Sequence, residues 1–365
     1  MTKIKEVVSF LDNIAPRMLS EDYDNVGLLI GDYNSEITGV LVTLDVTEDV
    51  IEEAIKTKKN LIVAHHPIIF RGLKKITKSN EVERVVYSAI KNDIAIYAGH
   101  TNFDNIKEGV NNKICEKLSL KNRKIISPMR NQLCKLITFV PENHAEKLRT
   151  VLFESGAGKI GNYDNASFNT EGEGTFRANE NAKPFVGKIG ETHHEKEIRI
   201  ETIFPLYNKG RVISALLNNH PYEEVAYDII ALENSFADAG SGMIGKLEKE
   251  LSEEEFLALV KKTFGTGVIK HTKLKGRKIK KVGVCGGSCS FLINSAKSAN
   301  IDAFITADIK YHEFFDVENS MLLLDIGHFE SEQYTKEIFY DLLTKNFSNF
   351  ATNLSEVETN PIKYY

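Results

Sequence analysis

The sequence predicts an α/β fold: a core domain based on parallel sheet, encoded in two sequence halves, and interrupted by an α+β insert domain. Two observations lead to this prediction. Short apolar runs rich in β-branched residues alternate with amphipathic helical stretches at both ends of the 365-residue chain, and this alternation is broken in the middle. A chain of this length also suits two or three domains.

The first half reads as repeated strand–helix units. Helical spacing of apolar residues predicts helices over 5–14, 48–58, 81–91 and 110–117. Compact apolar runs predict buried strands at 39–46, 60–64 and 93–98. Strands that alternate with helices at this spacing form βαβ units and therefore a parallel sheet.

The middle of the chain has a different pattern. We expect strands at 133–140, 197–205 and 224–232, helices at 142–155 and 208–218, and loops or an irregular hairpin over 156–183. The order β-α-β-β-α-β predicts a small ferredoxin-like domain. We therefore expect an insert domain at 129–245 and a core domain formed by 1–128 and 246–365.

The core pattern resumes after the insert. A capping-box-like Ser-Glu-Glu-Glu opens a predicted helix at 252–264. Short apolar strands follow at 281–284, 303–306 and 321–326, each before a helical stretch.

Composition narrows the possible functions. The net charge is −5, with acidic and basic residues well mixed, so nothing requires a nucleic-acid-binding face. No window approaches the roughly 18 apolar residues of a membrane span, and the N-terminus lacks an apolar signal core. We expect a cytoplasmic protein that binds neither nucleic acid nor membrane. Of its four cysteines only Cys285 and Cys289 are close in sequence, and we interpret them as buried thiols rather than a zinc site.

Histidines and acidic residues follow three of the predicted strands. His65 and His66 come after 60–64, His100 and Asp104 after 93–98, and a Gly-His-Phe-Glu-Ser-Glu segment after 321–326. Ligands and catalytic groups gather at the carboxyl ends of parallel strands. We therefore expect the three loops to converge on one edge of one sheet. A lone histidine at a strand end is usually structural, but three such loops indicate a metal site.

The spacing within these loops suits two metal ions. Neighbouring residues in extended chain point in opposite directions, so His65 and His66 are placed to serve two adjacent ions. His328 and Glu332 share a face if a helix begins near Gly327, and a carboxylate there could bridge two ions about 3.5–4 Å apart. Asp104 adds an anionic ligand. Imidazole and carboxylate ligands suit zinc, manganese, iron or nickel.

Six segments in the same order resemble the Nif-three-like family, whose members are often labelled GTP cyclohydrolase 1 type 2 homologs. They are listed here in chain order: YDNVGL (23–28), LVTLDVT (41–47), AHHP (64–67), GHTNFD (99–104), TADIKYHE (306–313) and GHFESE (327–332). The resemblance covers both core halves. HPYEEVAYDI (220–229) resembles the PII-like or CutA-like insert of longer bacterial members.

The resemblance implies a dinuclear centre in a homohexamer. Family members bind two divalent metal ions, and the matching positions here are His65, His66, Asp104, His328 and Glu332, with Glu332 as the bridging ligand. Zinc is the first expectation for the metal. Family members form hexamers of stacked trimers whose sites face an internal cavity.

We therefore expect a metal-dependent hydrolase of a nucleotide-like small molecule. The family label suggests GTP and opening of the purine imidazole ring, while a phosphoesterase reaction suits the same ligands. His100 is the candidate proton shuttle. Asp45 is expected to accept a hydrogen bond from a ligand histidine. The alternative is a metal-binding regulatory or scaffold hexamer without catalysis, whose insert domain senses a ligand or gates the cavity.

Overall fold

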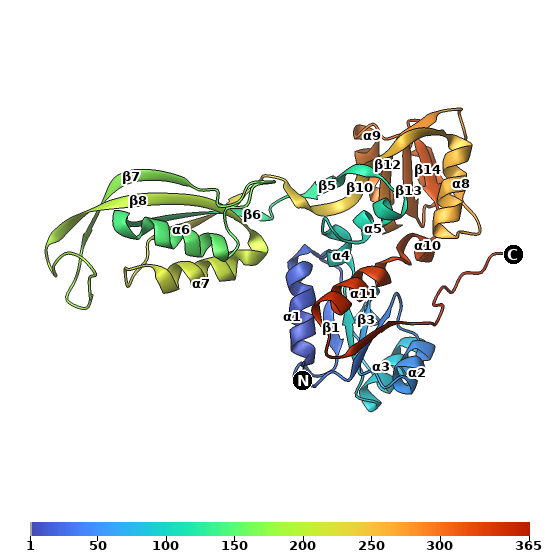
Figure 1. The fold of residues 1–365 in the computed structure, drawn as a ribbon, viewed down its shortest axis with the longest axis horizontal. Helices are drawn as coiled ribbons and strands as arrows, with labels where there is room; N and C mark the ends of the chain where they lie inside the picture. The colour runs from blue at the N-terminus through green and yellow to red at the C-terminus, as the bar shows by residue number, and fades with distance from the viewer. Residues whose placement is uncertain (1) are drawn as a thin grey trace. The chain divides into compact units, whose positions relative to one another are not determined.

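The computed structural model describes residues 2–365, which divide into two compact units (Figure 1). Unit 1 contains the chain up to Pro128 and again from Asp238 to Tyr365, and unit 2 contains Met129–Ala237. The fold is mixed α/β with several sheets. Within the described residues, no helix combines the length and apolar character needed to cross a bilayer.

Unit 1 carries its helices in both sequence halves. They are α1 (Ile4–Ile14), α2 (Glu48–Lys56), α3 (Glu81–Lys91), α4 (Thr101–Asn105), α5 (Val110–Lys117), α8 (Glu253–Phe264), α9 (Ile293–Ser298), α10 (His328–Glu332) and α11 (Thr335–Asn346), with 3-10 turns η1 (Arg17–Leu19), η4 (Ser290–Leu292) and η5 (Tyr311–Phe315). Side-chain caps fix several helix starts. The hydroxyl of Ser252 accepts from the backbone N–H of Glu255, whose carboxylate accepts from the Ser252 N–H, and α8 ends at Gly265 in the left-handed region.

Two separate sheets form the core of unit 1. The five-stranded sheet has the spatial order β1 (Gly27–Ile30), β4 (Ala95–Ala98), β3 (Leu61–Ala64), β2 (Gly39–Thr43) and β15 (Ala351–Leu354). Strands β15, β2, β3 and β4 are parallel, whereas β1 is antiparallel to β4. Helices α2 and α3 cover it with apolar side chains such as Val50, Ile51 and Val85, all buried.

The six-stranded sheet is built mainly from the second half. Its spatial order is β11 (Lys270–His271), β14 (Leu322–Asp325), β13 (Ala303–Ala307), β12 (Lys278–Ser288), β10 (Phe236–Ser252) and β5 (Lys121–Met129). Strands β12, β13 and β14 are parallel, and β10 is antiparallel to β12.

The expectation of one sheet carrying all three ligand loops is therefore wrong. Strands β3 and β4 belong to the five-stranded sheet and β14 to the six-stranded one. The physical reason lies at the edges of the first parallel group. There β4 pairs with β1 and β2 pairs with β15, so no edge of that group is free to accept β14.

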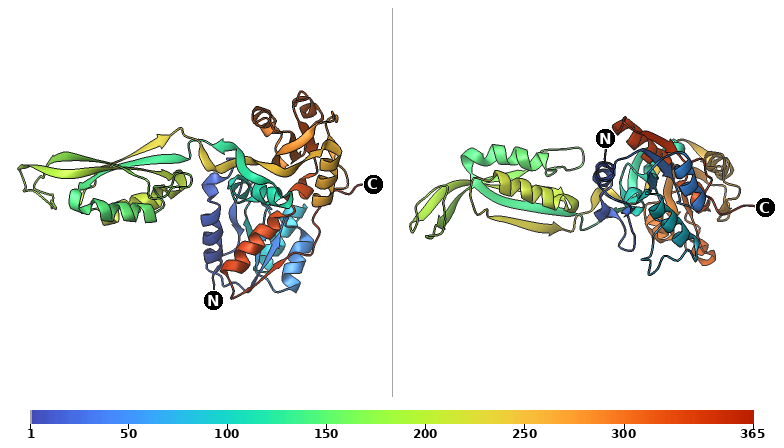
Figure 2. Two further views of the ribbon diagram at one scale, coloured as in Figure 1. Left: turned by 45° about the horizontal axis from the view of Figure 1, so that its top comes forward. Right: turned by 90° about the horizontal axis from the view of Figure 1, so that it is seen from below.

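Unit 2 runs in the order β6 (Leu133–Pro141), α6 (Ala145–Glu154), β7 (Phe168–Arg177), β8 (Thr192–Pro205), α7 (Lys209–Asn219) and β9 (Tyr227–Leu232), with 3-10 turns η2 (Glu142–His144) and η3 (Leu206–Asn208). Its antiparallel sheet has the order β7-β8-β6-β9. Helices α6 and α7 lie on one face of this sheet (Figure 2), where Leu136, Ile200 and Phe204 pack against Leu148 and Leu216.

Of the loops or irregular hairpin expected over 156–183, the structure contains the hairpin, and its first strand is regular. Strand β7 pairs with β8 without interruption from Phe168 opposite Glu201 to Arg177 opposite Thr192. The glycines of this segment weaken its own strand preference, but hydrogen bonding to β8 overrides that preference.

Candidate metal centre

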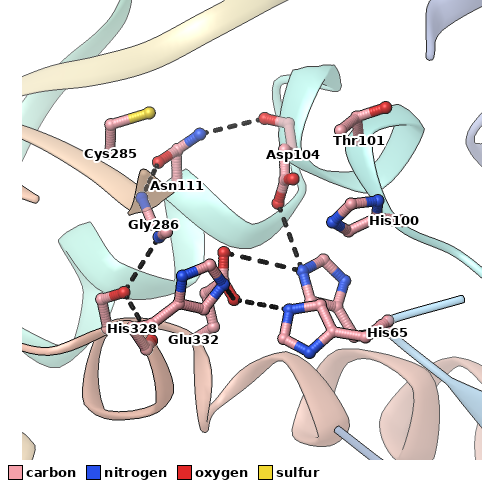
Figure 3. Close-up of polar contacts among 12 residues, drawn as sticks. His65, His100, Thr101, Asp104, Asn111, Cys285, Gly286, His328 and Glu332 are labelled. Atoms are coloured by element: carbon pink, nitrogen blue, oxygen red, sulfur yellow. Dashed lines mark hydrogen bonds and ion pairs between the residues drawn. The ribbon is translucent and has the colours of Figure 1, made fainter. Parts of the chain in front are cut away.

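The five expected ligands lie together at the carboxyl ends of parallel strands from both sheets of unit 1 (Figure 3). His65 and His66 directly follow β3, Asp104 lies on α4 after β4, and His328 and Glu332 lie on α10 after β14. The short helix α10 brings the last two onto one face. Both halves of the core therefore contribute donor atoms to one place.

Glu332 stands between two groups of donors. Its Oε2 lies 2.9 Å from Nε2 of His66 and 3.1 Å from Nε2 of His328. Its Oε1 lies 3.8 Å from Nε2 of His65, which is in turn 3.7 Å from Oδ1 of Asp104. Three groups among residues 2–365 offer three donor atoms close enough to hold one ion: His66–His328–Glu332, His65–Asp104–Glu332 and His65–His66–His100. The first two share only the Glu332 carboxylate.

Each of the three imidazoles is fixed through its Nδ1. The contacts are His65 to the carbonyl oxygen of Gly99 (2.8 Å), His66 to Oδ1 of Asp45 (2.6 Å) and His328 to Oδ2 of Asp308 (2.6 Å). Metal-binding histidines usually make such a second contact, which fixes the tautomer and the ring orientation. The Nε2 atoms are thereby all presented to the carboxylates.

The group around His65 consists of acceptors that face one another. A carbonyl oxygen only accepts, so Nδ1 of His65 donates to Gly99 and Nε2 of the neutral ring carries a lone pair. Both His65 Nε2 and Asp104 Oδ1 are buried and have no hydrogen-bond partner among residues 2–365. Buried polar atoms rarely stay unpaired. Two such atoms facing the Glu332 carboxylate fit a cation between them.

Electrostatics differ between the two groups. Burial lowers the pKa of His65 to about 4, so this ring is neutral at pH 7. Burial also disfavours the charged form of His66, but hydrogen bonds to Asp45 and Glu332 outweigh it and raise its pKa to about 10. The nearby Glu332 likewise helps raise the pKa of His328 to about 11 against the effect of burial.

The two carboxylates shift in opposite directions. Burial, with Glu332 nearby, raises the pKa of Asp104 well above its usual range. Burial acts in the same sense on Glu332, yet the adjacent His328 and the other imidazoles hold its pKa well below the usual range. Without metal, the protonated rings of His66 and His328 thus offset the negative charges of Glu332, Asp45 and Asp308, and a metal ion would have to replace these protons.

His100 lies beside this centre and is fixed by a second buried aspartate. Its ring centre lies 5.2 Å from that of His65 and 5.4 Å from that of His66. Its Nδ1 contacts Oδ1 of Asp24 at 2.8 Å, and Asp24 also accepts from the backbone N–H of Thr101. Burial opposes ionisation of Asp24, but the hydrogen bond from His100 lowers its pKa to about 2. The geometry leaves Nε2 of His100 for a ligand or a proton.

A cavity of about 170 Å³ opens onto the centre, and exposed aromatic rings lie around it. Tyr23 and Phe291, which both line it, are 66% and 65% exposed. Phe70 is 46% exposed, and its ring centre lies 6.2 Å from that of Tyr23 and 6.4 Å from that of His100. Large exposed rings beside a polar cavity can stack on a planar ligand.

The end of β12 forms one wall of the cavity. Cys285 and Cys289 are joined by a disulfide rather than being the free thiols expected from the sequence. Between them, the N–H of Gly286 donates to Oδ1 of Asn111 (Figure 3). The N–H of Gly287 donates to the Ser331 hydroxyl. A Cβ atom on Gly287 would collide with Oε1 of Glu332, so the absence of a side chain makes room for that carboxylate.

Two acidic residues at the centre lie outside the predicted ligand set. Asp308 follows β13 at its carboxyl end, and its spacing of four residues from His312 indicates either a lining of the cavity or a solvated helix face. The structure places its carboxylate against Nδ1 of His328. Asp24 lies before β1, where no periodicity marks it, and only its place in the YDNVGL segment drew attention to it. The nearby His312 is exposed on η5.

Comparison with known proteins identifies the family. The model of the family described as Duf34/NIF3 (NGG1p interacting factor 3) matches residues 2–361. This chain belongs to the Duf34/NIF3 family. The finding confirms the resemblance that the six sequence segments predicted.

Relatives match the chain over nearly its full length. Proteins named GTP cyclohydrolase 1 type 2 homolog are 37% identical in Bacillus subtilis, covering 99% of this chain and 98% of theirs, and 38% identical in Halalkalibacterium halodurans, covering 98% of each. The crystal structure of a Bacillus cereus protein related to NIF3 is 36% identical, has a TM-score of 0.87, and covers 100% of this chain and 99% of its own. The two-unit chain is therefore similar to these Duf34/NIF3 proteins in length as well as in fold.

Proposed function

We propose that this protein is a metal-dependent hydrolase that acts on a nucleotide-like small molecule at a centre of two divalent metal ions. The observation that carries the proposal is the position of Glu332. One of its oxygens faces His66 and His328, and the other faces His65. A carboxylate with this arrangement suits a bridging ligand of a two-metal site.

In this proposal each ion has its own ligands. His66 and His328 would hold one ion, His65 and Asp104 would hold the other, and Glu332 would contribute a carboxylate to both. Imidazole nitrogens and carboxylate oxygens suit zinc, manganese, iron or nickel, and we propose zinc as the first metal to test. The unpaired acceptors of His65 and Asp104 support the second position in particular.

The bound ions would supply Lewis-acid polarisation of the bond to be broken and would lower the pKa of water. The chain's own residues orient the metal ligands, transfer the proton and bind the substrate. Asp45 and Asp308 orient two of the ligand rings through Nδ1. His100, held by Asp24, moves a proton at its Nε2. Exposed rings such as Tyr23 and Phe291 are suited to stack against a planar base.

The name of the relatives points to GTP and to hydrolytic opening of the purine imidazole ring. Hydrolysis of a phosphoester would use the same ligands and the same proton transfer, so both reactions belong in the first substrate screen. The alternative is a metal-binding regulatory or scaffold protein without catalysis. That role would retain the ions but turn over nothing.

The assembly and domain assignments also remain proposals. We propose a cytoplasmic homohexamer of stacked trimers, with unit 2 as a ferredoxin-like, PII/CutA-like insert. The order β6-α6-β7-β8-α7-β9 supports the insert assignment. Light scattering of the full chain tests the hexamer, which predicts six times the 41.0 kDa of one chain.

Substitution of the ligands tests the function. Metal content and turnover of GTP and of an aryl phosphodiester would be measured for the wild type, Asp104→Ala and Glu332→Gln. We expect about two ions per chain and turnover in the wild type, with both lost in Glu332→Gln. Glu254→Gln, an exposed position on α8, is the matched control and should change neither.

The proton-transfer role has its own test. His100→Gln and Asp24→Asn should keep the metal content and lower turnover by about 10²-fold or more. If Glu332→Gln keeps full turnover, the two-metal mechanism is wrong. If the loaded wild type turns over neither substrate, the scaffold role takes its place.

A further inference from the structure

Unit 2 contains a second, larger cavity, of about 640 Å³. It is lined by β7 and β8, by the end of β6, and by the segments 178–185 and 222–226. Along β8, Ile198 and Ile200 pack toward the helices, whereas Glu197 and Arg199 point to the opposite face, where the cavity lies. Its volume is in the range of small-molecule sites.

The floor of this cavity lacks a side chain at two positions of β7. Gly172 and Gly174 alternate along β7 on the same side as Glu197, which is the cross-strand partner of Gly172. A Cβ atom on Gly172 would meet nothing within 4 Å, and one on Gly174 would collide with the Glu197 carboxylate. Glycine weakens a strand and often marks a point where a ligand approaches the backbone closely.

Aromatic rings form the walls. The ring centre of Tyr222 lies 6.0 Å from that of Phe176 and 6.3 Å from that of Phe185, and Phe139 also lines the cavity. The Tyr222 hydroxyl donates to Oε1 of Glu197 at 2.8 Å. This contact holds a carboxylate among the rings and leaves its second oxygen available.

The charge of the lining is negative. Five glutamates line the cavity, but Glu171 and Glu173 alternate with Gly172 and Gly174, so their carboxylates point to the other face of β7, where Glu173 contacts His194 at 2.9 Å. The carboxylates left for the cavity are those of Glu197, Glu223 and Glu224, and Oε1 of Glu223 accepts from the Lys183 N–H at 2.6 Å. The basic residue in the lining is Arg199, and its guanidinium pairs with Glu201 at 2.9 Å. Rings beside carboxylates attract cations through both the ring quadrupole and the full charge.

We propose that this cavity binds a small organic cation with a flat apolar body. Its body would lie on Gly172 between the rings of Phe176, Phe185 and Tyr222, and its ammonium group would contact the Glu197 carboxylate, which lies over Gly174. The proposal concerns unit 2 and is independent of the function proposed for the metal centre.

Three indole compounds of similar size test the charge preference. Tryptamine is a cation at pH 7, tryptophol is neutral and indole-3-acetate is an anion. The chain contains no tryptophan, so indole emission reports the probe alone. With the full-length protein we expect tryptamine to bind about tenfold tighter than tryptophol, and indole-3-acetate to bind weakest.

Two variants locate the binding. Glu197→Gln keeps the side-chain shape and should bring tryptamine to within about twofold of tryptophol. Gly172→Leu fills the floor without a clash and should abolish binding of all three compounds. Glu154→Gln, on an exposed position of α6, is the charge-matched control and should leave the order unchanged.

The other outcomes overturn the proposal. Equal affinity for the three compounds would show that the cavity does not prefer cations. If Gly172→Leu still binds tryptamine, the tryptamine site lies outside this cavity. If a second copy of the chain covers the cavity, no compound binds and Gly172→Leu changes the oligomeric state instead. That result would equally refute a ligand site.

Discussion

Replacing Asp104 by asparagine is expected to change stability in opposite directions with and without metal. In the metal-free protein Oδ1 of Asp104 is buried and faces the lone pair of His65 and the carboxylate of Glu332, and this environment raises the pKa of the Asp104 carboxyl. An acid whose pKa is higher in the folded than in the unfolded state destabilises the fold at neutral pH. Asparagine removes the charge and can donate its amide N–H toward Nε2 of His65, 3.7 Å from Oδ1 of Asp104.

The magnitude follows from the unpaired groups. A buried acceptor without a partner costs about 1–3 kcal/mol, so metal-free Asp104→Asn should be more stable than the metal-free wild type by about that amount. Metal at 100 times its Kd stabilises the wild type by about 2.7 kcal/mol per site, and the variant should lose this gain at one site. Each kcal/mol shifts the Tm of a domain of this size by about 2–4 °C.

Thermal unfolding measures both effects. The wild type and Asp104→Asn would be compared after chelation and after loading with zinc, with Asp341→Asn, an exposed aspartate of α11, as the matched control. We expect a higher Tm for the chelated variant and a lower Tm for the loaded variant. A variant that is destabilised equally with and without metal would refute the reasoning, because Asp104 would then be an ordinary structural residue.

Three further predictions concern the same centre. Gly287→Ala should lower the metal content several-fold, because the new Cβ atom would displace the Glu332 carboxylate. Gly276→Ala is the control: its φ of 69° is similar to the 66° of Gly287, but open space surrounds it, so the metal content should not change. Metal analysis of both variants checks this prediction. Metal affinity should rise with pH, because His66 (pKa about 10) and His328 (pKa about 11) must each release a proton to bind metal. Their folded pKa values lie above the ordinary 6.5, so the metal-free protein should lose stability as pH rises from about 6.5 toward 11. Calorimetric titrations in buffers of different ionisation enthalpy would detect the released protons, and a pH-independent affinity would contradict the assignment.

Local patterns predicted much of the core. The helix expected at 252–264 forms as α8, with the capping box that its first residues indicated. The strands expected at 60–64 and 93–98 form as β3 and β4 and are parallel. These elements are encoded by short-range periodicity and capping, which a sequence displays directly.

Long-range pairing was not predictable in the same way. β10 runs for 17 residues from Phe236 to Ser252, through a segment rich in glycine and alanine whose strand conformation depends on pairing with β12. The separation of the core into two sheets likewise depends on β15, a four-residue strand at the far end of the chain that closes the edge of β2.

In the candidate site, too, local patterns could be predicted from the sequence and long-range contacts could not. Functional groups collect at the carboxyl ends of parallel strands, and this rule predicted the set of candidate ligands from the sequence. The structure places these residues together: His65, His66, Asp104, His328 and Glu332. The contact from His100 to Asp24 joins positions 76 residues apart, and no local pattern encodes it. Contacts of this kind need the tertiary structure.

The central claim is that Glu332 is shared by two metal ions, and anomalous X-ray scattering from crystals of the zinc-loaded protein tests it most directly. We predict two anomalous peaks per chain, one beside Oε2 of Glu332 near His66 and His328, and one beside Oε1 near His65 and Asp104. A single peak, or two peaks of which neither lies against Glu332, would contradict the account.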